Sequence, residues 1–346
     1  MKVLLYDLLK AAVRLGFFFY FREIRMHGLE EVPADRAVML LPNHQNALID
    51  PLLYAAFARG RRPYFLTRSD VFKSPVLKWL FTGIRMLPVY RLRDGRETLG
   101  RNQAVFEKCA RLLAGGQHLL LFPEANHNMQ RRVRPLSKGF TRILEQSFRA
   151  SPHLPIHLVP VGVNYQQADG FPDRVAFYFG SPFDAREYWS PRDTHLSVSP
   201  LKARVFEALT HLTTHIPDGE DPVLWEGRLK EKGVDRLLPA QVNALLGGTA
   251  SAVTMQPGIP EIPGKIWDGI FRLLNAPVWI PWVWIRKNKV PEPEFTSTFR
   301  FLFFLLAFPL YYLLLGLVIT SVLSVGWGVG AVAVLLLHNL AYVKLR

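Results

Sequence analysis

The chain has 346 residues, 49% of them hydrophobic, and a formal net charge of +14 at pH 7. This length allows a sizeable core, and the charge indicates anionic partners: nucleic acid, anionic lipid head groups or phosphorylated substrates. The single cysteine, Cys109, excludes an intrachain disulfide, and we expect it to be a buried structural thiol. Residues 301–343 carry no charged side chain, so we expect a soluble domain with a membrane anchor, which favours lipid or phosphorylated partners over nucleic acid.

Residues 1–30 are predicted to form an amphipathic helix that associates with a membrane. The charged residues Lys2, Asp7, Lys10 and Arg14 interrupt the apolar run, and no small-residue cleavage pattern follows, which argues against a cleavable signal peptide. The leucines and the aromatic run from Phe17 to Phe21 suit the interface of a bilayer. The alternative is a core helix of the soluble domain.

From about Arg36 onward, short apolar runs alternate with longer amphipathic segments. We expect strands at residues 37–41, 64–66, 86–90, 118–122, 156–163 and 175–179. Helices are expected at residues 51–57, 74–81, 97–113 and 201–215. This alternation predicts a layered α/β domain over residues 31–216, with a mostly parallel sheet.

Residues 217–300 differ in composition from the predicted domain. We expect a helical stretch over 224–246 and a Gly- and Pro-rich linker over 247–264, which together make residues 217–264 a helical and linker region. Residues 265–300 contain Trp267, Trp279, Trp282 and Trp284, followed by a cluster of cations. Tryptophan flanked by cations suits a membrane interface, so we predict an interfacial segment there.

The last segment, residues 301–346, is predicted to be a transmembrane helical hairpin. A single helix over the 43 residues from 301 to 343 would be about 65 Å long, roughly twice the hydrocarbon thickness of a bilayer. Ser324 and the glycines that follow supply a turn between helices at 301–323 and 327–343. Arg300 and Lys344 flank the hairpin and place both of its ends in the cytoplasm. The alternative is a buried hairpin of a soluble protein.

A histidine and a carboxylate follow the first predicted strand of the domain, in the segment from Pro42 to Pro51. Active sites of open α/β sheets favour this position. An alcohol needs a general base to become a good nucleophile, and histidine titrates nearest to working pH. A carboxylate on the other ring nitrogen fixes the tautomer and stabilises the imidazolium. We therefore predict His44 as base and Asp50 as its orienting partner. The alternative is that Asp50 only caps the following helix.

Three other segments strengthen this interpretation. They run from Gly83 to Arg91, from Leu121 to Asn128 and from Val159 to Val161. In order and spacing, the four segments resemble the conserved blocks of the glycerolipid acyltransferase family, which includes bacterial lysophosphatidate acyltransferase. The resemblance covers about residues 35–190, and the family's catalytic histidine and aspartate map onto His44 and Asp50.

The resemblance implies an acyltransferase domain that needs no metal or other cofactor. Its co-substrate would be acyl-CoA or acyl carrier protein, and its acceptor the hydroxyl of sn-glycerol 3-phosphate or of 1-acyl-sn-glycerol 3-phosphate. The sequence does not choose between the donors or between the acceptors. The expected partners are thus membrane lipids, the thioester donor and the phosphorylated acceptor, with no nucleic acid. We expect a bacterial inner-membrane location with the catalytic domain in the cytoplasm.

In that family, the arginine that closes the second block and the glutamate of the third are associated with acceptor binding. These map onto Arg91 and Glu124. The planar fork of arginine matches a phosphate, whereas Glu124 is expected to accept a hydrogen bond from an acceptor hydroxyl or to orient nearby cations. Within the matched blocks, Asn43, Gly83 and Pro160 are further substrate-binding candidates by position.

Two departures from the family pattern affect this site. Five residues separate His44 from Asp50 where most members have four, so an irregular turn must restore their contact. In the third block, His127 occupies the place of the family's phosphate-binding arginine. We expect a cationic rim to compensate, formed by Arg131, Arg132, Arg134 and Lys138. The alternative is a solvated or lipid-facing basic loop.

Other chemistries find little support in the sequence. It contains no Gly-x-Ser-x-Gly nucleophile elbow, no phosphate loop that ends in Lys-Ser or Lys-Thr, and no His-Glu-x-x-His metal motif. Direct attack by the acceptor hydroxyl is therefore favoured over a covalent acyl-enzyme. The altered spacing and third block leave one rival function, a catalytically inactive membrane protein of the same fold that binds lipid or acts as a scaffold.

Overall fold

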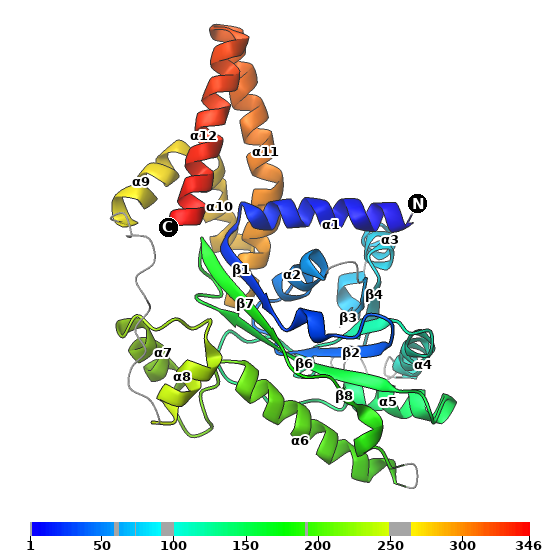
Figure 1. Cartoon of the computed structure of the whole chain (residues 1–346). Coiled ribbons are helices and arrows are strands. Elements are labelled where there is room, and N and C mark those ends of the chain that lie inside the picture. The colour runs from blue at the N-terminus through cyan, green and yellow to red at the C-terminus, as the bar shows by residue number, and fades with distance from the viewer. Residues whose placement is uncertain (1, 59–61, 73, 91–99, 191–192, 249–263) are drawn as a thin grey trace.

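A mixed eight-stranded sheet forms the centre of the molecule (Figure 1). The computed structural model describes residues 2–58, 62–72, 74–90, 100–190, 193–248 and 264–346. The strands are β1 (Phe21–His27), β2 (Ala37–Pro42), β3 (Tyr64–Arg68), β4 (Met86–Val89), β5 (His118–Leu120), β6 (Ile156–Tyr165), β7 (Asp173–Phe179) and β8 (Phe183–Asp184). Their order is β1-β7-β6-β2-β5-β3-β4, with β8 also on β6, and among the strands that the structure describes only the β6–β7 and β6–β8 pairs are antiparallel. The predicted α/β fold with a mostly parallel sheet is confirmed.

Helices cover both faces of this sheet. In chain order they are α1 (Lys2–Phe18), α2 (Ile49–Phe57), α3 (Pro75–Gly83), α4 (Arg101–Ala114), α5 (Gly139–Ala150), α6 (Thr194–Leu212), α7 (Pro222–Glu231), α8 (Pro239–Leu246), α9 (Gly264–Leu274), α10 (Ala276–Lys289), α11 (Thr296–Val322) and α12 (Val325–Leu345). Along β2, Val38 and Leu40 join a core with α1, α2, α10 and α11, whereas Met39 joins a core with α4, α5 and α6. This alternation follows from the two-residue period of a strand.

The second of these cores contains the single cysteine. Cys109 lies on α4 and is completely buried, as expected. Burial raises the pKa of its thiol to about 12. The thiolate is the nucleophilic form of cysteine, so Cys109 is inert near neutral pH.

The structure differs from the sequence prediction at the N-terminus. The predicted helix over residues 1–30 ends at Phe18, and Phe21–His27 forms the edge strand β1, parallel to β7. Ile24 and Met26 alternate with charged or polar neighbours, which is the two-residue pattern of a strand. On α1, Phe17 packs in the core while Leu4 and Leu8 are exposed, so the helix has both a core face and an outward apolar face.

Two other helical predictions were incomplete. Residues 139–150 form α5, which the sequence reading did not recognise as an element although Phe140, Ile143 and Leu144 lie on its buried face. The single helix expected over residues 224–246 is instead the pair α7 and α8. Gly233, between them, adopts a φ of +59°, a left-handed conformation that interrupts a helix and suits glycine.

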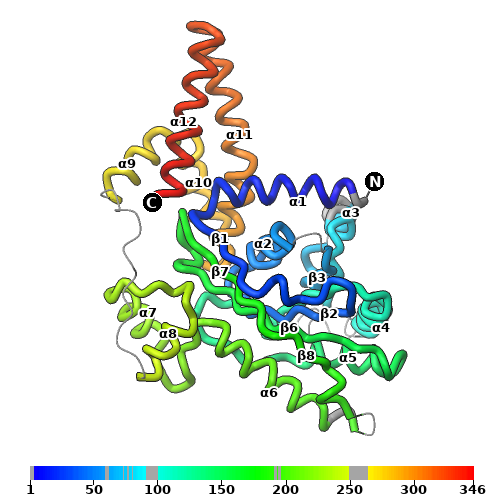
Figure 2. The backbone as a smooth tube through the Cα atoms, viewed as in Figure 1, coloured from blue at the N-terminus to red at the C-terminus, as the bar shows by residue number. Residues whose placement is uncertain are grey.

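The two C-terminal helices α11 and α12 project from the domain as a hairpin (Figure 1). Both are long and apolar enough to cross a membrane. They pack closely at Gly328, where an added Cβ would lie 2.1 Å from Oγ1 of Thr320, and small residues permit such an approach between apolar helices. The hairpin returns to the sheet, because Lys344 donates to the carbonyl of Phe21, so the C-terminus lies beside β1 (Figure 2).

The tryptophan-rich segment forms α9 and α10 beside the base of this hairpin. Trp267 and Trp282 are buried, 9% and 2% exposed, and pack against other aromatic residues. Trp284 is 57% exposed, next to the exposed Val283. The sequence prediction that all four tryptophans lie at a membrane interface is therefore wrong for Trp267 and Trp282, which are buried in the protein.

Asp173, at the start of β7, should make stability depend on pH. Its carboxyl is buried, and burial raises its pKa to about 8 against the opposing effect of hydrogen bonds from the backbone amides of Arg174 and Gln167 and, less strongly, of the charges of Arg131 and Arg300. An unfolded aspartate titrates near pH 4, so the folded state holds the proton more tightly. The contribution of Asp173 to stability is then fully present below about pH 4 and falls as pH rises towards 8, by at most about 1.4 kcal/mol per pH unit.

Asp173→Asn is expected to remove this slope. The check is thermal or denaturant unfolding of the detergent-solubilised protein between pH 5 and 8. If the stability of the variant declined in parallel with that of the wild type, the assignment to Asp173 would be wrong.

Candidate active site

His44 and Asp50 meet at the carboxyl end of β2. Nδ1 of His44 lies 2.8 Å from Oδ2 of Asp50, whose side chain is 1% exposed. The imidazole stacks on Phe122, which follows β5, with 3.6 Å between ring centroids. Because the carboxylate holds Nδ1, Nε2 is the ring nitrogen left to exchange a proton with another molecule.

The loop from His44 to Leu48 accommodates the five-residue spacing. It is not helical, and its backbone turns around the Asp50 carboxylate, so that the amides of Gln45 and Asn46 donate to Oδ2 at 3.0 and 2.9 Å. Asp50 lies inside the first turn of α2 rather than at its N-cap, which is Leu48. The capping alternative is therefore wrong, and the irregular turn expected from the sequence is present.

Tyr165 completes the surroundings of Asp50, and the sequence reading missed it. It is the last residue of β6 and donates its hydroxyl to Oδ1 of Asp50 at 2.6 Å. Burial, with the carboxylate as a second cause, raises the pKa of Tyr165 well above its usual value, so the phenol remains a donor. Its place at the carboxyl end of a strand beside β2 was the signal that could have identified it.

Glu124 holds the backbone of this site. Its nearly buried carboxylate accepts from the amide of His44 at 3.0 Å, from the amide of Arg134 at 2.9 Å and from the Arg134 guanidinium at 2.6 Å. The guanidinium also donates to the carbonyls of His44 and Asn126. Of the two roles expected for Glu124, the observed contacts match orientation of a cation, and that cation is Arg134.

The remaining residues of the expected rim lie elsewhere. Arg131 is buried and pairs with Glu226 of α7 at 2.7 Å. The guanidinium of Arg132 donates to the carbonyls of Ile216, Pro217 and Glu220. Both arginines thus hold the segment after α6 against the domain, which argues against the expected substrate contacts. Lys138 is exposed and lines a hollow between α5 and α6.

The other candidates from the matched blocks have structural surroundings. Asn43 pairs with the backbone of Val163 through both its amide nitrogen and its oxygen, which ties β2 to β6. Pro160 is buried in β6 opposite Leu41. Gly83 ends α3, where an added Cβ would lie 3.5 Å from Leu5 of α1. None of these three is joined to the His44 ring by a contact among the described residues.

Arg91 lies outside the described residues, so its place in the site stays a prediction. The strand before it, β4, ends at Val89. A hollow of about 430 Å³ at the carboxyl ends of β3 and β4 is lined by Lys78, Tyr90 and Arg101, among others. It opens at the same edge of the parallel strands as His44, and its wall has two cationic side chains and one carboxylate, that of Asp70.

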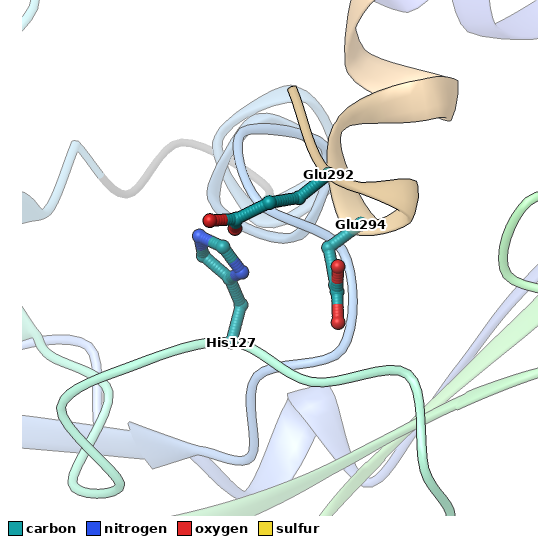
Figure 3. Close-up of side chains that lie close together, drawn as sticks. All are labelled: His127, Glu292 and Glu294. Atoms are coloured by element: carbon teal, nitrogen blue, oxygen red, sulfur yellow. The ribbon is translucent and has the colours of Figure 1, made fainter. Parts of the chain in front are cut away.

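One group among the described residues has the donor set of a divalent-cation site. His127, Glu292 and Glu294 bring their ligand atoms within 4.8 Å of one another, from the loop after β5 and the segment before α11 (Figure 3). Burial, and then the nearby His44, lower the pKa of His127, while the two carboxylates oppose this shift. Two carboxylates at the position of the family's arginine make it unsuitable for a phosphate.

Comparison with known proteins decides the family. Residues 23–164 match the model of the Acyltransferase family. This segment of the chain belongs to the acyltransferase family. It contains His44, Asp50 and Glu124, and the resemblance inferred from the four sequence blocks is confirmed.

Individual relatives of this acyltransferase domain are distant. The chain is 27% identical to the chloroplastic 1-acyl-sn-glycerol-3-phosphate acyltransferase BAT2 of Brassica napus, over 41% of this chain and 39% of that protein. It is 23% identical to glycerol-3-phosphate O-acyltransferase 2 of Saccharomyces cerevisiae, over 50% of this chain and 28% of that protein. The crystal structure of the LPA acyltransferase PlsC from Thermotoga maritima superposes with a TM-score of 0.42 and 19% identity, over 58% of this chain and 78% of that one. The match thus spans less than two-fifths of the length of the Brassica napus and Saccharomyces cerevisiae proteins.

Breaking the Arg134–Glu124 pair is expected to destabilise the domain. In Arg134→Gln the buried carboxylate of Glu124 loses its charged partner, at a cost of about 3 kcal/mol in unfolding free energy. Arg149→Gln is the matched control, because Arg149 forms an exposed pair with Glu145 and should cost less than about 1 kcal/mol. Denaturant unfolding of both variants checks this, and equal losses would show that the pair has no special importance.

Proposed function

We propose that this chain transfers a fatty acyl group from a thioester, acyl-CoA or acyl carrier protein, to a hydroxyl of a phosphorylated glycerol acceptor. The acceptor is sn-glycerol 3-phosphate or 1-acyl-sn-glycerol 3-phosphate. The observation that carries the proposal is the contact between His44 and a buried, fully hydrogen-bonded Asp50 within an acyltransferase-family domain. Such a pair is suited to activate an alcohol.

In the proposed reaction, Nε2 of His44 takes the proton of the acceptor hydroxyl while that oxygen attacks the thioester carbonyl. Asp50 stabilises the imidazolium that forms and keeps the ring in its orientation. The tetrahedral intermediate then collapses, the carbon–sulfur bond breaks, and the leaving thiolate receives the proton from His44. The ester and the free thiol are the products, and no covalent acyl-enzyme is required.

Cationic groups support a phosphorylated acceptor. Lys78 and Arg101 line the hollow at the ends of β3 and β4, and Arg91 follows β4 in sequence. A guanidinium in this region would bind the phosphate bidentately and bring the acceptor hydroxyl towards His44. Binding here rather than at His127 avoids the carboxylates of Glu292 and Glu294.

The apolar hairpin supports action at a membrane. We infer that α11 and α12 span the bilayer, that the exposed apolar faces of α1, α9 and α10 lie at its interface, and that the domain faces the cytoplasm of a bacterium. Both ends of the hairpin, with Arg300 and Lys344, lie against the domain. This arrangement keeps the active site near donor and acceptor lipids, which partition into the bilayer.

The rival function is a membrane lipid-binding or scaffold protein without turnover, and His127 in place of an arginine favours it. Acyl transfer by the purified, detergent-solubilised protein separates the two. Labelled oleoyl-CoA, or oleoyl acyl carrier protein, is supplied with each acceptor in a separate reaction. We expect product from one acceptor, which would identify the substrate. The absence of product with either acceptor and either donor would reject the proposal and favour lipid binding.

A further inference from the structure

The base of the apolar hairpin touches the loop that carries His44. Leu48, the last residue of that loop, donates its backbone amide to Oγ1 of Thr298 at 3.1 Å. Thr298 is buried in the first turn of α11, 250 residues further along the chain. The amides at the start of a helix have no partner within that helix, so α11 supplies a partner at the N-terminus of α2. The family match ends at residue 164, so α11 lies outside it.

Neighbouring residues of α11 hold the other part of the loop indirectly. Asn46 donates its side-chain amide to the carbonyl of Ala168 at 2.7 Å, and the hydroxyl of Ser297 donates to the same carbonyl at 2.8 Å. Arg300, which is buried, donates to the carbonyls of Asp169 and Gly170, and to the hydroxyl of Tyr20 at 2.8 Å. The start of α11 therefore fixes the loop between β6 and β7, and that loop fixes Asn46.

We propose that Thr298 is a positioning residue for the acyl transfer inferred above, and that the hairpin base is thereby part of the active site. The inference rests on the proposed function. The loop from His44 to Leu48 supplies both the imidazole and the two amides that orient Asp50. Without the Thr298 hydroxyl, the amide of Leu48 loses its partner and the loop can shift. A displacement of the order of 1 Å at a catalytic group can lower the rate by about 10²-fold.

Because the same helix continues into the hairpin, the loop is mechanically joined to the segment inferred to lie in the bilayer. A shift of α11 relative to the domain would therefore move the loop from His44 to Leu48 and change the distance between His44 and Asp50. No separate linker intervenes, since Thr298 and the apolar run belong to one continuous helix.

The test compares Thr298→Val, which keeps the shape and removes the hydroxyl, with Thr298→Ser, which keeps the hydroxyl. Thr296→Val is the matched control, because Thr296 is buried in the same turn and makes no hydrogen bond to the loop among the described contacts. We expect kcat of Thr298→Val to fall at least about tenfold with KM for both substrates within about twofold, and Thr298→Ser and Thr296→Val to stay near the wild type. A merely structural role would lower the unfolding temperature and the folded fraction without changing kcat per folded molecule.

A second readout needs no turnover: the rate at which diethyl pyrocarbonate modifies His44 at pH 7, followed by peptide mass spectrometry. A loosened loop should raise this rate in Thr298→Val by more than about twofold and leave it unchanged in the other two variants. If the wild type shows no acyl transfer but His44 is still modified faster in Thr298→Val, the positioning role is retained and the proposed acyl transfer is rejected. Normal kcat and normal modification in Thr298→Val would overturn the positioning role.

Discussion

Replacing His44 with alanine is expected to lower kcat for acyl transfer about 10³-fold, since a positioned general base contributes about 10² to 10⁴. In the wild type the ring is held on both sides, by Asp50 at Nδ1 and by the stack on Phe122. No other imidazole can take over, because the nearest described one, His127, meets His44 edge-on at 5.5 Å between centroids and lies beside two carboxylates. The measurement is initial rates with the acceptor that the wild type uses.

His27→Ala is the matched control for this experiment. His27 also stacks on an aromatic ring, that of Tyr178, but it is exposed on the edge strand β1. We expect the control to keep wild-type kcat and to unfold within about 1 kcal/mol of the wild type, because the ring of His27 is exposed. Because His44 contacts a buried carboxylate, the rate of His44→Ala is measured per folded molecule. Equal kcat in His44→Ala and His27→Ala would falsify the assignment of His44 as the base. It would leave the lipid-binding function as the better explanation.

The strands of the sheet were predictable because they are buried on both faces and therefore appear as short, continuous apolar runs. Residues 37–41 and 156–163 were recognised in this way and pair as β2 and β6. The edge strand β1 was missed because it follows an apolar helix and carries several charges, so composition alone joined it to that helix. Its partner strand β7 lies about 150 residues further along the chain, so the pairing has no local signal in the sequence.

The contact between His44 and Asp50 was predictable because both belong to one segment. The residues that complete the site come from distant parts of the chain: Tyr165 at the end of β6 and Thr298 on α11. Neither has a spacing that points to His44. Only the topology, which brings the carboxyl ends of β2 and β6 to one edge and the base of α11 against them, places these residues together.

The basic residues of the loop after β5 were grouped together by the sequence, but the structure separates them. Arg131, Arg132 and Arg134 are equivalent in sequence, as cations of one loop, and were expected to act together. Their partners separate them: Glu226 pairs with Arg131, backbone carbonyls hold Arg132, and Glu124 places Arg134 against His44. Charge can be counted from a sequence, but whether a charge is free to bind a ligand depends on tertiary contacts.

Asp50→Asn is expected to lower kcat by about 10²- to 10³-fold, no more than loss of His44 itself, while the loop keeps its shape. In the wild type, Oδ2 of Asp50 accepts from Nδ1 of His44. This contact keeps the proton on Nδ1 and leaves Nε2 able to act as base. The same atom also accepts from the amides of Gln45 and Asn46. An asparagine oxygen in the place of Oδ2 can accept from the same three donors, and its NH₂ group then faces the hydroxyl of Tyr165. What the neutral amide cannot do is stabilise the imidazolium that forms when His44 takes the proton, and kcat falls for that reason.

The control for this variant is Asp184→Asn, which removes another carboxylate that accepts from a backbone amide and from an arginine, at β8 and away from the site. We expect Asp184→Asn to retain wild-type kcat. Steady-state rates at saturating substrate give the comparison, and circular dichroism confirms that both variants are folded. If Asp50→Asn kept more than about a tenth of wild-type kcat, the carboxylate would have only a structural role in the loop. His44 would then have to act without an orienting partner, and the proposed mechanism would lose its central element.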